Sequence, residues 1–146
     1  MRGLLGELLV PKLDSMESKG SNDVRFEFFE AGGAPEPTFN VIPRDDLHAK
    51  RSENLRKARK ILVMYHDSKI VGLVFLNRKL HIFSMLTWIV SKEFQSKGFG
   101  TIMTKRFIQD VDTRPLFAYC RNIKSIKLAE RTGFTVVGSF AYRIRR

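Results

Sequence analysis

The sequence contains few of the residues that staple a small protein together. Its 146 residues include a single cysteine, Cys120, and the three histidines do not combine with it in a zinc-type spacing. A lone cysteine cannot form an internal disulfide, so we expect a reducing compartment and a buried, inert thiol. We predict a chain that binds no metal.

Long hydrophobic runs are also missing. No segment approaches the roughly 18 uncharged apolar residues of a membrane-spanning helix. The apolar run 3–10 is short, contains Glu7 and lacks a small-residue cleavage site. We therefore predict a cytoplasmic protein with no membrane partner.

Acidic residues are scarce compared with basic ones. The chain has 26 Lys and Arg against 15 Asp and Glu, a net charge of +11, with the densest basic run at 50–60. This balance favours a polyanionic partner such as RNA or a ribosome. The sequence has no signature of a common RNA-binding module. A generally basic, well-solvated surface explains the composition equally well.

Two familiar phosphate-binding motifs are absent, namely G-x-x-x-x-G-K-[ST] and G-x-G-x-x-G. Instead, the segment 95–100, QSKGFG, follows the apolar run 82–90 and opens a helical pattern. Gly98 and Gly100 lack side chains and let backbone amides approach an anion, and the helix dipole adds to the attraction. We expect a phosphate group there. The same two glycines can also serve only to make the bend between strand and helix.

A second motif, 122–134, reads NIKSIKLAERTGF and predicts a short helix that begins at Asn122 and ends at Gly133. Taken together, Q-x-x-G-x-G after a strand and N-x-x-S-x-x-L-x-E-R-x-G-F further on resemble the GCN5-related N-acetyltransferases, the GNAT superfamily. The resemblance covers residues 61–146.

The hydrophobic pattern agrees with the fold that this resemblance implies. That fold is α+β, with a mixed, mostly antiparallel central sheet, helices on both faces and central strands that splay apart. We expect one domain over 23–146, after an N-terminal extension and linker at 1–22. Asn77 is predicted to begin a turn, and Asp45 or Asp46 to cap a basic helix. The expected strands are 24–30, 61–65, 70–76, 82–90, 116–120, 134–137 and 139–144, and the expected helices follow residues 45, 98 and 121.

The resemblance also implies acetyl-CoA as the co-substrate. The end of the strand before the glycine turn would offer free backbone groups to the pantetheine arm, and the turn would offer amides to the pyrophosphate, with Lys97 as a nearby cation. Asn122 would contact the cofactor arm, although it equally suits a plain helix N-cap. The implied cofactor-binding residues are Trp88, Ile89, Val90, Gln95, Ser96, Lys97, Gly98, Phe99, Gly100, Thr101 and Asn122.

The catalytic positions depart from the family pattern. Ala129 stands where many members carry a tyrosine that protonates the leaving thiolate, and Ser84 and Phe117 align with positions that hold carboxylate bases in others. The remaining candidates for a catalytic group are Ser84, Tyr119 and Cys120. A tyrosine or cysteine at a strand end is more often a packing residue.

Two functions follow from these observations. The first is an acetyl-CoA-dependent N-acetyltransferase that transfers an acetyl group by direct attack to an amine, which the basic surface suggests belongs to a macromolecule. The alternative is a degenerate GNAT-fold module that binds a nucleic acid or protein assembly with little catalytic activity. The sequence is also compatible with a homodimer.

Overall fold

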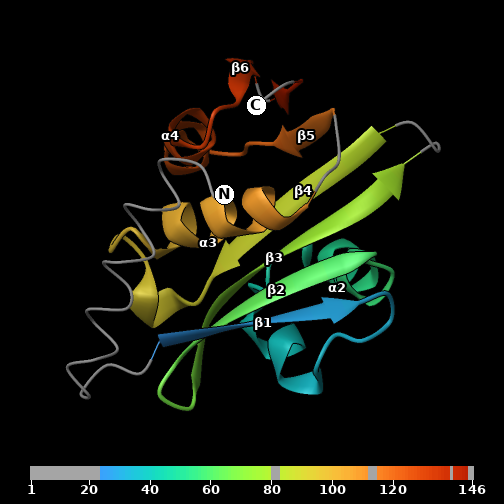
Figure 1. Cartoon of the computed structure of the whole chain (residues 1–146), viewed down its shortest axis with the longest axis vertical. Coiled ribbons are helices and arrows are strands. Elements are labelled where there is room, and N and C mark those ends of the chain that lie inside the picture. Colours follow the sequence, from blue (N-terminus) through green and yellow to red (C-terminus); the bar gives the residue numbers. More distant parts are fainter. Residues whose placement is uncertain (1–23, 80–82, 112–114, 139, 145–146) are drawn as a thin grey trace.

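The protein forms a seven-stranded mixed sheet in the order β1-β2-β3-β4-β5-β7-β6 (Figure 1). The computed structural model describes residues 24–79, 83–111, 115–138 and 140–144, so the predicted extension 1–22 lies outside the described residues. All neighbouring strands pair antiparallel except β4 and β5, which are parallel. The predicted α+β class is confirmed. The strands are β1 (Val24–Glu30), β2 (Lys60–His66), β3 (Lys69–Lys79), β4 (Phe83–Val90), β5 (Leu116–Tyr119), β6 (Thr135–Val137) and β7 (Phe140–Arg143).

Helices cover both faces of the sheet, as the sequence predicts. Period-two alternation divides the buried side chains of β2, β3 and β4 between two core clusters on opposite faces. The helices α3 and α4 pack on one face, whereas α2 and η1 pack on the other. Their bounds are η1 (Glu36–Val41), α2 (His48–Arg56), η2 (Lys92–Phe94), α3 (Phe99–Asp110) and α4 (Ile123–Arg131).

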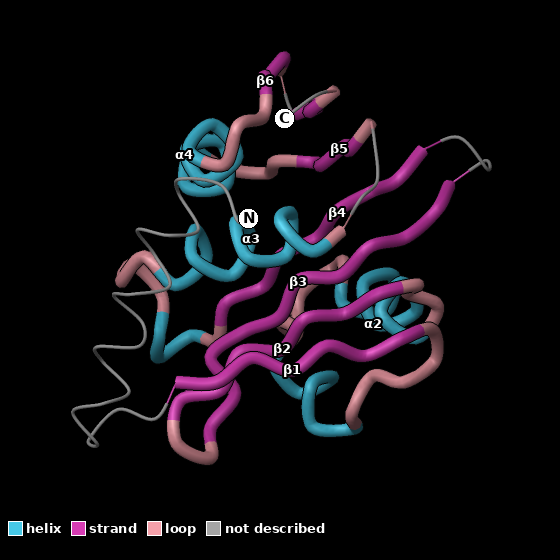
Figure 2. The backbone as a smooth tube through the Cα atoms, viewed as in Figure 1, coloured by secondary structure: helices cyan, strands magenta, loops and turns pink. Residues whose placement is uncertain are grey.

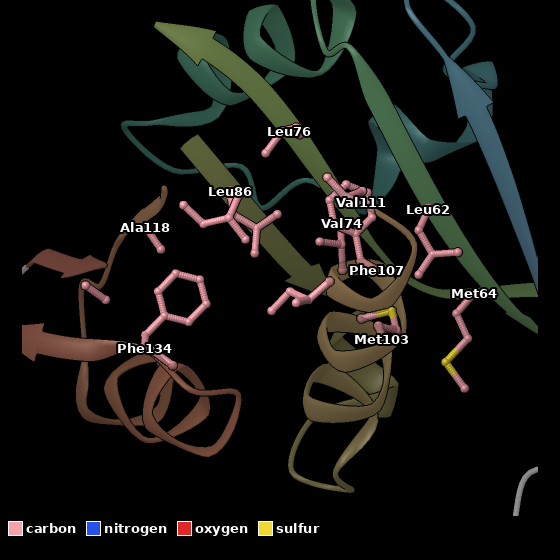
Figure 3. Close-up of a cluster of buried hydrophobic side chains, with 14 of the residues drawn as sticks. Leu62, Met64, Val74, Leu76, Leu86, Met103, Phe107, Val111, Ala118 and Phe134 are labelled. Atoms are coloured by element: carbon pink, nitrogen blue, oxygen red, sulfur yellow. The ribbon is translucent and has the colours of Figure 1, made fainter. Parts of the chain in front are cut away.

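The larger core lies between α3 and the sheet (Figure 3). Met103 and Phe107 are fully buried, and Ile108 and Val111 are nearly so, because apolar residues spaced by three and four form one stripe on α3. Figure 3 shows Phe107 beside Val74 of β3. This packing fixes the N-terminus of α3 beside the end of β4.

The two central strands separate along their length. β5 pairs with β4 only from Ser84 to Leu86, whereas β4 continues to Val90. In Figure 2, the strands β1 to β3 lie on one side of β4, and β5 and β6 lie on the other. The second half of β4 therefore has an edge that no strand in the described part of the chain covers, which confirms the predicted splay.

Two local predictions were wrong. The predicted turn at Asn77 is the end of β3, and its side-chain Nδ2 donates to Asn54 O at 2.8 Å, which satisfies a buried amide within a strand. The basic helix begins after Leu47 rather than after Asp45 or Asp46. The Asp45 carboxylate accepts a hydrogen bond from Leu47 N and so closes a turn before the helix instead of capping it. It also ends at Arg56, since Arg59 N donates to Leu76 O and the chain enters β2.

Candidate active site

A cleft with a volume of about 1220 Å³ opens where β4 and β5 separate. Its walls come from the second half of β4, the glycine turn, the start of α3, the end of β5 and one side of α4. The segment before α2 and the first turns of that helix close it on the other face. The cleft therefore joins segments that are far apart in the sequence.

The exposed edge of β4 offers backbone hydrogen-bonding groups to this cleft. Ser91 N donates to Val71 O across the β3–β4 pairing, so the peptide groups of Ser91 and Ile89 point toward β3. Because the direction alternates along a strand, those of Trp88 and Val90 point the other way, into the cleft. Gln95 Nε2 donates to Val90 O at 3.1 Å and anchors the glycine turn to the strand. All three residues that the sequence predicts from β4 line the cleft.

The glycine turn forms a concave set of amides at the start of α3. Ser96 and Gly98 both have positive φ, 64° and 85°, and Gly98 is the helix N-cap. No side chain caps α3, and its first helical hydrogen bond runs from Ile102 N to Gly98 O. The N–H groups of residues 98–101 precede that bond and point out of the helix. Such a nest, with the helix dipole behind it, attracts an anion.

A lysine that the sequence analysis missed lies beside this nest. Lys124 Nζ donates to Ser96 Oγ at 3.2 Å, which brings the start of α4 against the glycine turn. Lys127 and Arg131 continue the same cationic side of α4 along the cleft. In contrast, the predicted cation Lys97 is exposed and is not a lining residue. Their spacing of three and four residues places Lys124, Lys127 and Arg131 on one side of the predicted helix, and this pattern could have identified them from the sequence.

Close packing inside the protein, as well as the approach of a ligand, favours glycine at position 100. A Cβ at this position would lie 2.7 Å from Leu128 Cδ1 and 3.3 Å from Val90 Cγ2. The missing side chain therefore lets α3 pack closely against both β4 and α4. These are the elements that carry the nest, the free strand edge and Lys124.

Asn122 is the N-cap of α4, one of the two readings that the sequence allows. Its Oδ1 accepts from Ser125 N at 2.9 Å, and Ser125 Oγ accepts from Asn122 N at 3.2 Å, completing a capping box. Asn122 also lines the cleft. Contact with a cofactor stays a prediction.

The three catalytic candidates lie in different environments. Ser84 is only 6% exposed, and neither it nor Cys120 lines the cleft. Burial raises the pKa of the Cys120 thiol, which lies 3.7 Å from Ser125 O. Tyr119 lines the cleft and is 61% exposed. Ala129 is fully buried in the core. Tyr119 is thus the one of the three whose side chain can reach a molecule in the cleft.

A charged group opposite the nest was also missed. Arg51 Nη1 lies 3.2 Å from both Asp45 oxygens, and Arg121 Nη1 lies 3.7 Å from Asp45 Oδ2. The backbone N–H of Leu47, followed by these arginines, lowers the pKa of Asp45. A carboxylate stabilised in this way is a poor general base. Asp45 and Arg121 belong to distant segments, so no sequence spacing connects them.

No group of three metal-ligating side chains occurs within residues 24–79, 83–111, 115–138 and 140–144. In the same residues, no helix is both long and apolar enough to cross a membrane.

Residues 25–134 match the sequence model of the Acetyltransferase (GNAT) family. No curated protein sequence matches the chain significantly.

Several solved structures share the fold. An acetyltransferase from Elizabethkingia anophelis with acetyl-CoA bound is 14% identical, with a TM-score of 0.68 over 84% of this chain and 98% of that one. A Bacillus subtilis acetyltransferase in complex with CoA is 14% identical, with a TM-score of 0.66 over 84% and 99%. A variant spermidine N-acetyltransferase from Vibrio cholerae is 17% identical, with a TM-score of 0.60 over 83% and 93%. At these identities the likeness concerns the fold.

Proposed function

Because the chain belongs to the acetyltransferase (GNAT) family, we propose that it transfers an acetyl group from acetyl-CoA to an amine by direct attack. One observation carries the proposal: the uncapped start of α3 and the unpaired edge of β4 face the same cleft. The first binds an anion and the second binds amides, which is the chemistry of a pyrophosphate joined to a pantetheine arm.

The residues present fit this co-substrate. The amides of residues 98–101 and Lys124 Nζ would hold the pyrophosphate, and Lys127 and Arg131 supply further positive charge along the cleft. The peptide groups of Trp88 and Val90 would pair with the pantetheine amides, as a neighbouring strand would. When bound, acetyl-CoA supplies a thioester whose acyl carbon is open to attack by an amine.

The protein contributes chiefly position and polarisation to the transfer. A backbone N–H from the free edge of β4 can donate to the thioester carbonyl and stabilise the charge that develops on its oxygen. The amine nitrogen then bonds to the acyl carbon, the bond from that carbon to sulfur breaks, and water accepts the proton that the amine loses. Tyr119 lines the cleft and can donate a proton to the departing sulfur.

Lys124→Ala should weaken acetyl-CoA binding about 10- to 100-fold, because a charge-assisted contact contributes roughly 1.5 to 3 kcal/mol. Lys97→Ala is the matched control and should change the dissociation constant less than about twofold, since its side chain does not line the cleft. Isothermal titration calorimetry at low and physiological salt would measure both. An equal loss for the two variants would contradict the placement of Lys124 at the phosphates.

Tyr119→Phe and Cys120→Ala should each lower turnover less than about 10-fold, because a thiolate leaves without much help. Loss of an essential general acid would instead cost about 10²- to 10⁴-fold. The pH profile of turnover should rise as the acceptor amine loses its proton. It should show no falling limb from an essential tyrosine or thiol. A loss of about 100-fold or more in either variant, with acetyl-CoA affinity unchanged, would instead identify the acid.

The basic run at 50–60 gives limited support to the predicted RNA or ribosome partner. Arg51 pairs with Asp45, and Lys57 Nζ lies 3.1 Å from Glu53 Oε2. Arg56 stacks 4.9 Å from the ring centre of Phe39. Because these side chains already have intramolecular partners, they form a less continuous cationic surface for a polyanion. We therefore favour a small amine over a macromolecular one as the acceptor.

The proposed function is tested by thiol release from acetyl-CoA in the presence of a mixture of amines. We expect release that requires both the protein and an amine. Acetyl-CoA at a hundredfold excess over its dissociation constant should also stabilise the fold by about 2.7 kcal/mol, and NAD or ATP by much less. Binding of acetyl-CoA without thiol release from any amine would favour the degenerate binding module instead.

A further inference from the structure

The lining of the cleft differs between the two faces of the sheet. The nest and α4 line one end, on the face of the sheet that carries α3. The segment before α2 and the first turns of that helix line the other end, on the opposite face. With the phosphates in the nest, the α2 end of the cleft is the part left for the acceptor amine.

Two arginines line the α2 end of the cleft. Arg51 is held by both oxygens of Asp45 at 3.2 Å and is 21% exposed. Arg121 is held more loosely, 3.7 Å from Asp45 and 3.8 Å from Asp46, and is 41% exposed. Long, exposed ion pairs are weak, so another carboxylate can replace these partners of Arg121 at small cost. Asp45 therefore fixes Arg51, whereas Arg121 is available to bind an incoming carboxylate.

An aromatic wall stands beside Arg121. Tyr119 pairs in register with Phe140, so their side chains lie on the same face of the β5–β7 pair. Both line the cleft, and Phe140 is 48% exposed. Phe117 lies behind Phe140 with ring centres 6.2 Å apart and supports it. Exposed aromatic rings in a cleft offer a stacking surface to an apolar or planar group.

We infer that the acceptor is an amine that carries both a carboxylate and an apolar, preferably aromatic, group, which means an amino acid rather than a polyamine. Its carboxylate would bind Arg121 in a charge-assisted pair, and its side chain would pack on Tyr119 and Phe140. Polyamines lack both features. The carboxylate at the α2 end of the cleft, Asp45, is engaged by two arginines, and Lys50 adds a positive charge that repels a polyamine. This inference rests on the proposed function.

The test compares matched amines by kcat/KM: phenylalanine, phenethylamine without the carboxylate, alanine without the ring, and spermidine. Phenylalanine should be preferred over each of the others by about 10-fold or more. Binding of phenylalanine to the CoA-saturated protein, measured by calorimetry, provides a readout that does not require turnover.

Variants then assign the two contacts. Arg121→Gln should lower kcat/KM and affinity for phenylalanine about 10- to 100-fold and leave phenethylamine within about twofold, while Arg121→Lys should recover part of the loss. Phe140→Ala should reduce both aromatic amines about 2- to 10-fold and leave alanine unchanged. Arg59→Gln, an exposed arginine outside the cleft, is the control and should behave as the parent.

The outcomes separate this inference from the function that it builds on. Turnover of spermidine or phenethylamine in preference to phenylalanine would overturn the inference and leave the acetyltransferase intact. An equal effect of Arg121→Gln on phenylalanine and phenethylamine would do the same. No thiol release with any of the four amines would overturn the inference, and only the absence of release with the broader mixture of amines, although acetyl-CoA binds, would overturn the proposed function as well.

Discussion

Gly100→Val is expected to weaken acetyl-CoA binding by at least about 100-fold, which corresponds to about 2.7 kcal/mol. The new side chain would meet Leu128 Cδ1 at 2.7 Å and Val90 Cγ2 at 3.3 Å. The end of the Leu128 side chain can move aside for the Cβ, but the two methyl groups of valine need further room between α3, β4 and α4, so we expect the start of α3 to move away from these elements. That shift would displace the amides of the nest from the strand edge and from Lys124, so the phosphates and the pantetheine arm could no longer be held together.

The second site variant Leu128→Ala supplies the control for this effect. It removes the atom nearest to the added side chain, so Gly100→Val combined with Leu128→Ala should recover part of the lost affinity. Calorimetry of the parent, both single variants and the double variant gives the coupling. Circular dichroism would check that each variant remains folded, since overpacking also costs about 1 to 3 kcal/mol of stability. Parent-like affinity in Gly100→Val would contradict the role of this contact.

Gly72→Ala is expected to lower the free energy of unfolding by about 3 kcal/mol, the upper end of the usual range for overpacking a core. Gly72 lies in the central strand β3, opposite Val90 of β4. An added Cβ would overlap the carbonyl oxygen of Ile89 and lie 2.8 Å from Met103 Cε. The methionine side chain can move, but the carbonyl belongs to a paired strand and cannot.

Gly32→Ala is the matched control for this prediction. Gly32 has a φ of +75° and no atom within 4 Å of the added Cβ, so its cost of about 1 to 2 kcal/mol comes only from backbone strain. Urea denaturation followed by circular dichroism gives both values. A Gly72→Ala protein as stable as the parent would mean that β3, β4 and α3 do not approach one another as closely as the structure has them.

Sequence periodicity was sufficient to predict most of the fold. The strand Val24–Glu30 has the predicted bounds, and α3 begins directly after Gly98, as predicted. Their apolar residues repeat with the period of their own element, and burial follows the same period. The end of β3 could not be predicted in this way. Its polar residue Asn77 is buried because Asn54, in a different element, accepts its hydrogen bond.

The candidate site was predictable only where backbone chemistry forms it. The glycine turn and the end of β4 are local features, and both line the cleft. Side chains brought in from elsewhere were missed, because Lys124 reaches Ser96 and Arg121 reaches Asp45 only after the sheet has formed. Lys97 was predicted from its position within the motif, but an exposed turn residue can point away from the cleft that its neighbours line.

The most direct test of this account is a titration of the isotopically labelled protein with CoA, followed by backbone-amide chemical shifts. The account predicts that the largest saturable shifts occur in two segments that meet only in the cleft, the amides of residues 96–101 and those of Trp88 and Val90. Amides of the distant edge strand β1 should stay unchanged. Saturable shifts confined to other segments, or no shifts at millimolar CoA, would contradict the claim that this cleft binds the co-substrate.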